Sequence, residues 1–357
     1  MRFLLLGVAA LFTMAGCGGD TGKDAAGGSG GQAPSGGSGG AGGSGGSGGA
    51  TGGAPATGLG GWGPAGTHGV TRIAVGYSAI GPILTPSSVY FGVKTEVGAS
   101  HHSIYRLDKA TGDAAVVAQF PDGASELAVS ETRLFFAGKG FQGEGPPADG
   151  WLKIVDVDTG ELVPFATFTQ MAPHSLVVSG GYVWFTAGDV LRRIPTGGGV
   201  VEDMTALAER RPFAASGTRI YLEGAGAITA YDSATDLLEP LATWADPWSD
   251  LKLRQGSFYW RTMTASPALV GVPEGGGTPA QILSSSGIHF DVGNHLFRDG
   301  GACPNGTVER QSLADTTGED WVTGVCWPSG LVLDTQHLYF FDVRPDERAD
   351  LVRVEVE

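Results

Sequence analysis

The sequence predicts an all-β fold, a seven-bladed β-propeller whose blades each contain four antiparallel strands. One phrase carries this prediction and recurs seven times after residue 80: an apolar stretch, a short polar turn and an aromatic-rich triplet. The triplets follow one another about every 41 residues, which matches the repeat length of a four-stranded blade. They lie at 89–91, 134–136, 183–185, 220–222, 258–260, 295–297 and 338–340.

Each triplet has strand-like neighbours on both sides. An alternating apolar stretch precedes it, and a turn of Gly, Ser, Asp or Asn joins the two as in a β-hairpin. A third stretch follows and ends in an Asp/Thr/Gly or Pro/Gly turn, and a fourth closes the unit. The expected first strands lie at 126–129, 175–178, 212–215, 250–253, 287–290 and 330–333. No segment shows sustained helical periodicity, so the predicted class is all-β.

The two ends of the repeat region complement each other. Residues 70–77 read as a strand that belongs to no complete unit, and 351–357 read as a third strand with no fourth after it. Pairing 70–75 with 351–356 would complete the seventh blade and remove two exposed sheet edges. We therefore predict that the N-terminal strand closes the last blade.

The repeats resemble the propeller repeats of uncharacterised bacterial lipoproteins and, more loosely, the YVTN, NHL and YWTD repeat groups. The resemblance rests on phrases such as 183–185 followed by 191–195 and a glycine run. It covers residues 70–357, but no blade carries a strict YWTD or YVTN tetrad. It implies architecture alone, because propellers host many unrelated functions.

The first 17 residues resemble a bacterial lipoprotein signal peptide. Arg2 supplies the positive charge, 3–15 form a short apolar run, and 14–17 resemble a lipobox that ends in Cys17. The run is too short to span a bilayer as a permanent helix. The resemblance implies cleavage before Cys17 and lipid attachment there, hence an extracytoplasmic protein anchored at the outer membrane or cell surface. The alternative is an ordinary secretory signal that leaves Cys17 as an unpaired thiol.

Residues 18–66 are rich in Gly and Ser and carry three charges, a composition typical of a flexible tether. The remaining domain, 67–357, carries the whole formal net charge of -15. A negative domain argues against nucleic acid as a partner and against electrostatic docking on anionic lipid. The expected membrane contact is therefore the lipid anchor alone.

Cys303 and Cys326 remain as a pair once Cys17 is assigned to the anchor. In an oxidising compartment a disulfide between them is expected. Cys303 lies between the second and third strands of the sixth blade, and Cys326 follows its fourth strand. Loops of both kinds emerge on the same face of a propeller, so the bridge also tests the strand assignment.

Other motif matches carry no chemistry. Residues 58–63 fit G-x-G-x-x-G and 36–40 fit G-x-S-x-G, but both lie in the tether, where neither strand nor helix is expected. The Asp/Thr/Gly turns offer few oxygens each, whereas calcium takes six or more. We therefore predict no metal and no cofactor.

The candidate site follows from propeller topology. The first strand of each blade lines the central channel, so residues at the beginnings of these strands ring one channel mouth. The ionisable ring members are Glu126, His174, Arg211 and Asp250, and the loops that enter the inner strands add Trp248 and Trp327. Polar groups converging beside exposed tryptophan are typical of a ligand site. The alternative is that the charges pair with each other or with water and the tryptophans cover the blade ends.

Three functions remain open on this evidence. The first is a binding or scaffold module that engages a protein or glycan of the cell envelope. The alternative is a lyase or hydrolase with His174 as general base and Glu126 or Asp250 as acid, which requires these groups within reach of one substrate atom. The third is a structural envelope component without a ligand.

Overall fold

The computed structural model of the chain describes residues 67–94, 102–120, 124–130, 132–139, 149–284, 289–300, 303–314 and 317–356. The predicted signal peptide 1–17 with Cys17 and the predicted tether 18–66 lie outside the described residues. The described ranges contain 27 strands and two short 3-10 helices, η1 (Thr67–Gly69) and η2 (Thr205–Leu207). In these ranges no helix has the length and apolar character needed to cross a membrane.

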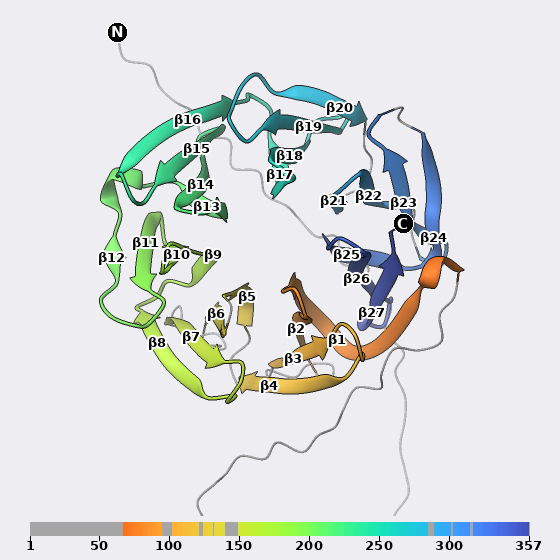
Figure 1. Cartoon of the computed structure of the whole chain (residues 1–357), viewed down its shortest axis with the longest axis horizontal. Coiled ribbons are helices and arrows are strands. Elements are labelled where there is room, and N and C mark those ends of the chain that lie inside the picture. Colours follow the sequence, from red (N-terminus) through yellow and green to blue (C-terminus); the bar gives the residue numbers. More distant parts are fainter. Residues whose placement is uncertain are drawn as a thin grey trace, which may run out of the picture. The chain divides into compact units, whose positions relative to one another are not determined.

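Five four-stranded antiparallel sheets and one seven-stranded antiparallel sheet are arranged in a ring (Figure 1). The first two four-stranded sheets are β5 (Ala124–Val129), β6 (Arg133–Lys139), β7 (Gly150–Asp156) and β8 (Leu162–Phe168), then β9 (Pro173–Ser179), β10 (Tyr182–Ala187), β11 (Val190–Pro195) and β12 (Glu202–Asp203). The next two are β13 (Arg211–Ser216), β14 (Arg219–Gly224), β15 (Ala227–Asp232) and β16 (Leu237–Thr243), then β17 (Trp248–Arg254), β18 (Ser257–Thr262), β19 (Ala268–Pro273) and β20 (Ala280–Ser284). The fifth is β21 (Phe290–Val292), β22 (His295–Gly300), β23 (Gly306–Ser312) and β24 (Gly318–Val325).

The seven-stranded sheet joins the two ends of the repeat region. Its order is β25 (Trp327–Leu333), β26 (His337–Val343), β27 (Arg348–Glu355), β1 (Thr71–Leu84), β2 (Ser88–Lys94), β3 (His102–Asp108) and β4 (Ala114–Phe120). The first half of β1 pairs with β27, with Thr71 opposite Arg353 and Ile73 opposite Leu351, whereas its second half pairs with β2. The predicted pairing of 70–75 with 351–356 is confirmed. One long strand thus serves two four-stranded units, where the sequence suggested two separate strands.

The aromatic triplets form the interfaces between neighbouring sheets. Phe185 of β10 meets Phe168 of β8 edge-on with ring centroids 5.3 Å apart, and Tyr221 of β14 meets Phe258 of β18 at 4.9 Å. Phe185, Tyr221 and Phe258 are fully buried. Burying a large apolar side chain contributes roughly 1.5–3 kcal/mol, so the repeated triplet is the main stabilising element of each sheet pair.

Most inner strands contain a β-bulge. The register of β9 shifts between His174 and Val177, that of β17 between Ser249 and Lys252, and that of β25 between Ser329 and Val332. Ser175 and Asp250 lie in these shifts with φ of 59° and 53°, in the left-handed region. A bulge re-aims the side chains around it, so strict alternation along these strands does not give side-chain direction.

The first strand of the sixth unit differs from the expectation of 287–290. The structure places β21 at Phe290–Val292, and residues 285–288 lie outside the described residues. His289, expected inside this strand, precedes it, and its backbone N–H donates to Asp299 Oδ1 at 2.8 Å. The physical reason is Asp291, whose fully buried carboxylate is held by an ion pair with Arg254 and so fixes the position of the strand.

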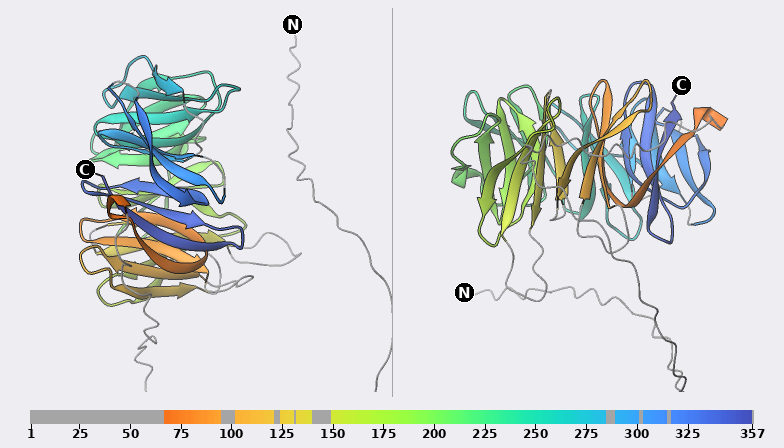
Figure 2. Two further views of the ribbon diagram at one scale, coloured as in Figure 1. Left: turned by 90° about the vertical axis from the view of Figure 1, so that its right-hand side faces the viewer. Right: turned by 90° about the horizontal axis from the view of Figure 1, so that it is seen from below.

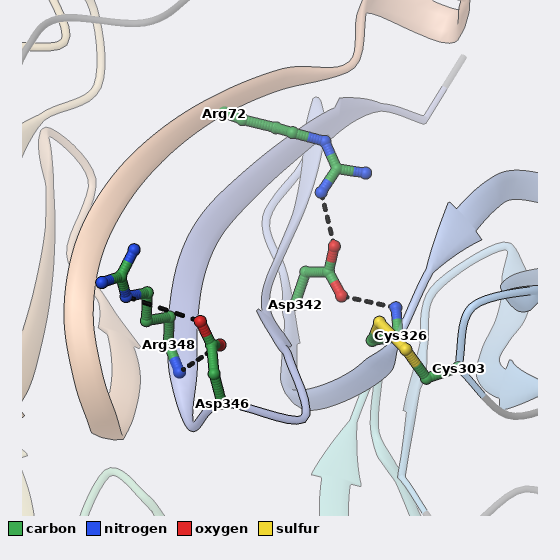
Figure 3. Close-up of a disulfide and its surroundings, with 6 residues drawn as sticks. All are labelled: Arg72, Cys303, Cys326, Asp342, Asp346 and Arg348. Carbon is green, nitrogen blue, oxygen red and sulfur yellow. Dashed lines mark hydrogen bonds and ion pairs between the residues drawn. A yellow bond between two sulfur atoms is a disulfide. The ribbon is translucent and has the colours of Figure 1, made fainter. Parts of the chain in front are cut away.

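The predicted disulfide is confirmed. Cys303 lies between β22 and β23, Cys326 lies between β24 and β25, and their Cα atoms are 3.9 Å apart. Beside the bridge, the backbone N–H of Cys326 donates to Asp342 Oδ1 at 2.6 Å, and Arg72 Nη1 contacts Asp342 Oδ2 at 2.6 Å (Figure 3). The buried Asp342 therefore connects the disulfide to β1, the strand shared by two units.

Candidate functional site

The ionisable residues expected at one channel mouth lie near the beginnings of four successive inner strands. Glu126 is in β5, His174 in β9, Arg211 in β13 and Asp250 in β17. Side views show the strands running between the two faces of the ring of sheets (Figure 2). The beginnings and the ends of the inner strands therefore lie at different faces.

Glu126 connects two of these strands. Its Oε2 accepts a hydrogen bond from the backbone N–H of Leu176 at 3.1 Å. Burial raises the pKa of the Glu126 carboxyl, and the amides of Leu176 and Ser175 oppose the rise. The carboxylate therefore contacts the backbone two residues beyond His174, and part of its role is to join β5 to β9.

His174 and Arg211 are electrostatically linked. His174 Nδ1 lies 3.1 Å from Ser175 Oγ. Burial lowers the pKa of His174, and the positive charge of Arg211 lowers it further, while Asp189 acts in the opposite direction. His174 is consequently a neutral imidazole near pH 7, the protonation state of a base or a hydrogen-bonding group.

Glu223 joins this group and was missed from the sequence. It lies opposite Arg211 in the register of β13 and β14. Burial raises the pKa of Glu223 to about 7, against the lowering effect of Arg211. The hairpin register is the signal that could have found it, because the last residues of β14 face the first residues of β13.

Among the described residues, no hydrogen bond or ion pair joins Asp250, Trp248 or Trp327 to that group. Asp250 occupies the bulge of β17, and its charge opposes the lowering of the Lys252 pKa that burial causes. Trp248 and Trp327 are the first residues of β17 and β25, not loop residues as expected. Trp248 is half-buried edge-on against Trp244 at 5.5 Å, whereas Trp327 is 47% exposed. Trp248 thus covers the end of its sheet, and Trp327 is available at the surface.

A cavity of about 840 Å³ lies at the other ends of the inner strands. Its apolar lining includes Leu84, Val292 and Leu333, the last residues of β1, β21 and β25; Val292 is buried, whereas Leu84 and Leu333 are half-buried. Exposed Gln255, Thr335 and Gln336 are among its polar residues. A smaller cavity of about 180 Å³ shares part of this lining and extends it to Asn294 and His295. No sequence motif marks this mouth, because its residues come from the turns of four different units.

One side of the 840 Å³ cavity is formed by a Lys109–Asp334 ion pair. Lys109 Nζ lies 2.7 Å from Asp334 Oδ2, and Asp334 Oδ1 accepts the backbone N–H groups of Gln336 and His337 at 2.9 and 2.8 Å. Burial alone would raise the pKa of Asp334, but Lys109 and the two amides outweigh it and hold the pKa below its usual value. The carboxylate is therefore firmly ionised.

Arg254 also lines the cavity, and it is ion-paired with the fully buried Asp291. Arg254 Nε and Nη2 donate to the two carboxylate oxygens of Asp291 at 2.6 and 3.1 Å. Asp291 also accepts the backbone N–H groups of Val292 at 2.9 Å and Leu333 at 2.8 Å. This bidentate pair ties β17, β21 and β25 together beside the cavity.

Lys252 strengthens the same junction. Its ammonium donates to the carbonyl oxygens of Phe290 and Leu331, the latter at 3.0 Å, and lies over the Phe290 ring. Burial lowers its pKa, although nearby Asp291 raises it. Lys252 and Arg254, two positions apart in β17, are thus structural ties, and their alternation in an apolar strand was the available sequence signal.

No protein-family model and no curated protein sequence matches the chain. Among solved structures, an oligogalacturonate lyase in complex with manganese is similar with a TM-score of 0.59 and 11% identity, over 83% of this chain and 96% of that one. The likeness is one of fold. A prolyl endopeptidase aligns with a TM-score of 0.54 and 13% identity over 79% of this chain and 51% of its own. The Pyrococcus horikoshii acylaminoacyl peptidase aligns with a TM-score of 0.52 and 13% identity over 77% of this chain and 53% of its own. This chain therefore spans about half the length of each peptidase.

Proposed function

We propose that the chain is a lipid-anchored extracytoplasmic protein whose closed, seven-bladed β-propeller binds a glycan or a protein of the cell envelope without turning it over. The observation that carries the proposal is the 840 Å³ cavity, whose volume lies in the range of small-ligand sites. Its two carboxylate neighbours, Asp291 and Asp334, are already occupied by cations and backbone amides. Carboxylates held in this way suit a binding site better than proton transfer to a substrate.

Attachment to the membrane is the second part of the proposal. It rests on the lipobox-like end at Cys17, the Gly/Ser-rich segment 18–66 and the formal net charge of -15, which gives the domain no electrostatic affinity for anionic lipid. Cys17→Ser should move the protein from the membrane fraction to the soluble fraction and abolish labelling by a radioactive fatty acid. Membrane retention of this variant would contradict lipid anchoring.

Filling the cavity tests the binding function. Thr335 is exposed and lines both cavities, so Thr335→Trp should obstruct them without disturbing the core. We expect an envelope glycan or peptide fragment that raises the melting temperature of the full chain to lose this effect in Thr335→Trp. Val200→Trp, at an exposed apolar position near β12, is the matched control and should respond like the parent. Equal ligand response in Thr335→Trp and the parent would contradict the assignment.

The alternative is a lyase or hydrolase at the opposite mouth, with His174 as base and Glu126 or Asp250 as acid. The observation in its favour is that burial raises the pKa of Glu126, which favours the protonated form of an acid, and lowers the pKa of His174, which favours the neutral form of a base. The similar structures include a lyase and peptidases, and at 11–13% identity they support the fold only. Product release from envelope glycans or peptides by the purified chain, lost in His174→Ala and kept in Thr335→Trp, would establish this alternative in place of pure binding.

A further inference from the structure

We infer that the 840 Å³ cavity takes an acidic saccharide, a sugar that bears a carboxylate. The inference rests on the proposed binding function and names its ligand class. It starts from the two cations of the cavity lining: Lys109 follows β3, and Arg254 ends β17. The two belong to different sheets of the ring, so the cavity has charged N–H donors from two sheets, each cation being also ion-paired with a carboxylate.

The carboxylates beside these cations have little acceptor capacity left. An ionised carboxylate offers about four lone-pair sites. Asp291 receives two N–H groups from Arg254 and one each from Val292 and Leu333. Asp334 receives Lys109 and the backbone amides of Gln336 and His337. A ligand donor therefore finds little to bind at either carboxylate.

The cations, in contrast, retain donors that no described residue accepts. A lysine ammonium has three N–H groups and an arginine guanidinium has five. Lys109 directs one at Asp334, and Arg254 directs two at Asp291 and one at the Leu253 carbonyl. Charged N–H donors bind carboxylate oxygens more strongly than neutral ones. The surplus of charged donors over available acceptors favours an anionic, acceptor-rich ligand.

The rest of the lining distinguishes a sugar from a peptide. In the turns at this mouth the backbone N–H groups of Thr85, Gly293 and Asp334 are satisfied within the turns, at 2.9, 2.9 and 3.0 Å. They are not available to a peptide main chain. Recognition falls to side chains instead: the amides of Gln255 and Gln336 and the hydroxyl of Thr335 match sugar hydroxyls. The half-buried Leu84 and Leu333 match the apolar face of a sugar ring.

The net charge of the chain makes the inference specific. With a formal charge of -15, the protein repels anions in general, so retention of an acidic sugar depends on local contacts with Lys109 and Arg254. The carboxylate of the ligand, and not its size, should therefore decide binding.

Isothermal titration of the full chain with an α-1,4-linked galacturonate trimer and with its methyl ester tests this directly. The two probes share the sugar backbone and hydroxyls; the ester replaces each carboxylate by an uncharged methyl ester. We expect the ester to bind at least about tenfold more weakly, because each charge-assisted contact is worth more than 1.4 kcal/mol. Lys109→Gln should weaken binding of the acid by a similar factor and leave the ester unchanged. Arg219→Gln, which removes an exposed ion pair on β14, is the matched control and should bind like the parent.

The ester comparison uses the parent protein, so it decides the question even if Lys109→Gln does not fold. Equal binding of acid and ester, both blocked by Thr335→Trp, would overturn the acidic-sugar inference and leave the binding function in place. Absence of binding by the acid would also overturn the inference. The binding function would then be tested separately, by comparing how envelope glycans and peptides change the melting temperature of the parent and of Thr335→Trp. Binding of the acid that Thr335→Trp leaves unchanged would place the site elsewhere and contradict both.

Discussion

At the scale of single residues, the charged groups of this protein divide into structural ties and groups with displaced pKa values. Asp291 is a structural tie, with no exposed surface and with hydrogen bonds that reach β17, β21 and β25. Glu223 is the other kind, a carboxyl that burial keeps close to half-protonated at neutral pH. Replacing a residue of the first kind should lower the free energy of unfolding, whereas replacing one of the second kind should change how that free energy depends on pH.

Asp291→Ala should lower the free energy of unfolding by about 3 kcal/mol, because it leaves two backbone amides and Arg254 without their buried acceptor. Urea denaturation of the full chain measures the change. Glu239→Ala breaks the exposed Arg219–Glu239 pair and should cost less than about 1 kcal/mol. Equal losses in the two variants would show that burial does not set the value of the Asp291 pair.

Glu223 should make stability fall with rising pH. Its pKa is about 7 in the folded protein against an ordinary value of 4.5, so stability is full below pH 4.5 and is lost as pH rises through about 7. Glu223→Gln removes this loss and should raise the free energy of unfolding at pH 8 by roughly 1–2 kcal/mol, allowing for partial solvent exposure, with little effect at pH 4.5. Denaturation curves at both pH values check the sign. Destabilisation by Glu223→Gln at pH 8 would be evidence against a raised pKa.

At the scale of elements, the weakest inner strand has the most external support. β21 is three residues long, whereas β17 and β25 on either side have seven. Its sheet is reinforced by the Arg254–Asp291 pair on the inner side and by the Cys303–Cys326 bridge between its turns. These ties compensate for the short ladder of hydrogen bonds.

Removal of the disulfide should therefore destabilise this sheet before the others. The bridge spans 23 positions in the sequence, for which the chain-entropy estimate gives about 3 kcal/mol. The double variant Cys303→Ser, Cys326→Ser should lose about this amount and show faster hydrogen exchange in β22 to β24. Mass spectrometry of the non-reduced parent should find neither thiol alkylatable. Two free thiols in the purified protein would contradict the bridge.

At the scale of the whole molecule, β1 makes the two ends of the repeat region depend on each other. Its first half pairs with β27 and its second half with β2, so the last sheet unit and the first share one strand. The buried Asp342 adds a side-chain contact from β26 to Arg72 of this strand. Loss of strand pairing at one end of the repeat region should therefore destabilise the sheet unit at the other end.

Deletion of residues 351–357 should for this reason destabilise the whole ring and not one sheet. The truncated chain exposes the edges of β26 and β1 and should melt at a lower temperature in a single transition, as followed by circular dichroism. A control that shortens an outer strand, such as Leu237→Pro in β16, should have a smaller and local effect. A truncated chain that melts like the parent would refute mutual dependence of the ends.

The sequence by itself determined the periodic features. The aromatic triplets, the apolar alternation and the Gly- and Asp-rich turns repeat locally, so they predicted the strands and their order. The pairing of 70–75 with 351–356 was predicted because each end is a strand without a complete unit. The Cys303–Cys326 bridge was predicted because both cysteines lie in loops expected on one face. Only the tertiary structure decided where the cavity lies and which charges it exposes. The bulges at Ser175 and Asp250 break the alternation from which side-chain direction is inferred. Lys109, Arg254, Asp291 and Asp334 are far apart in the chain, and no local pattern encodes their contacts, because each depends on how separate sheets pack around the ring.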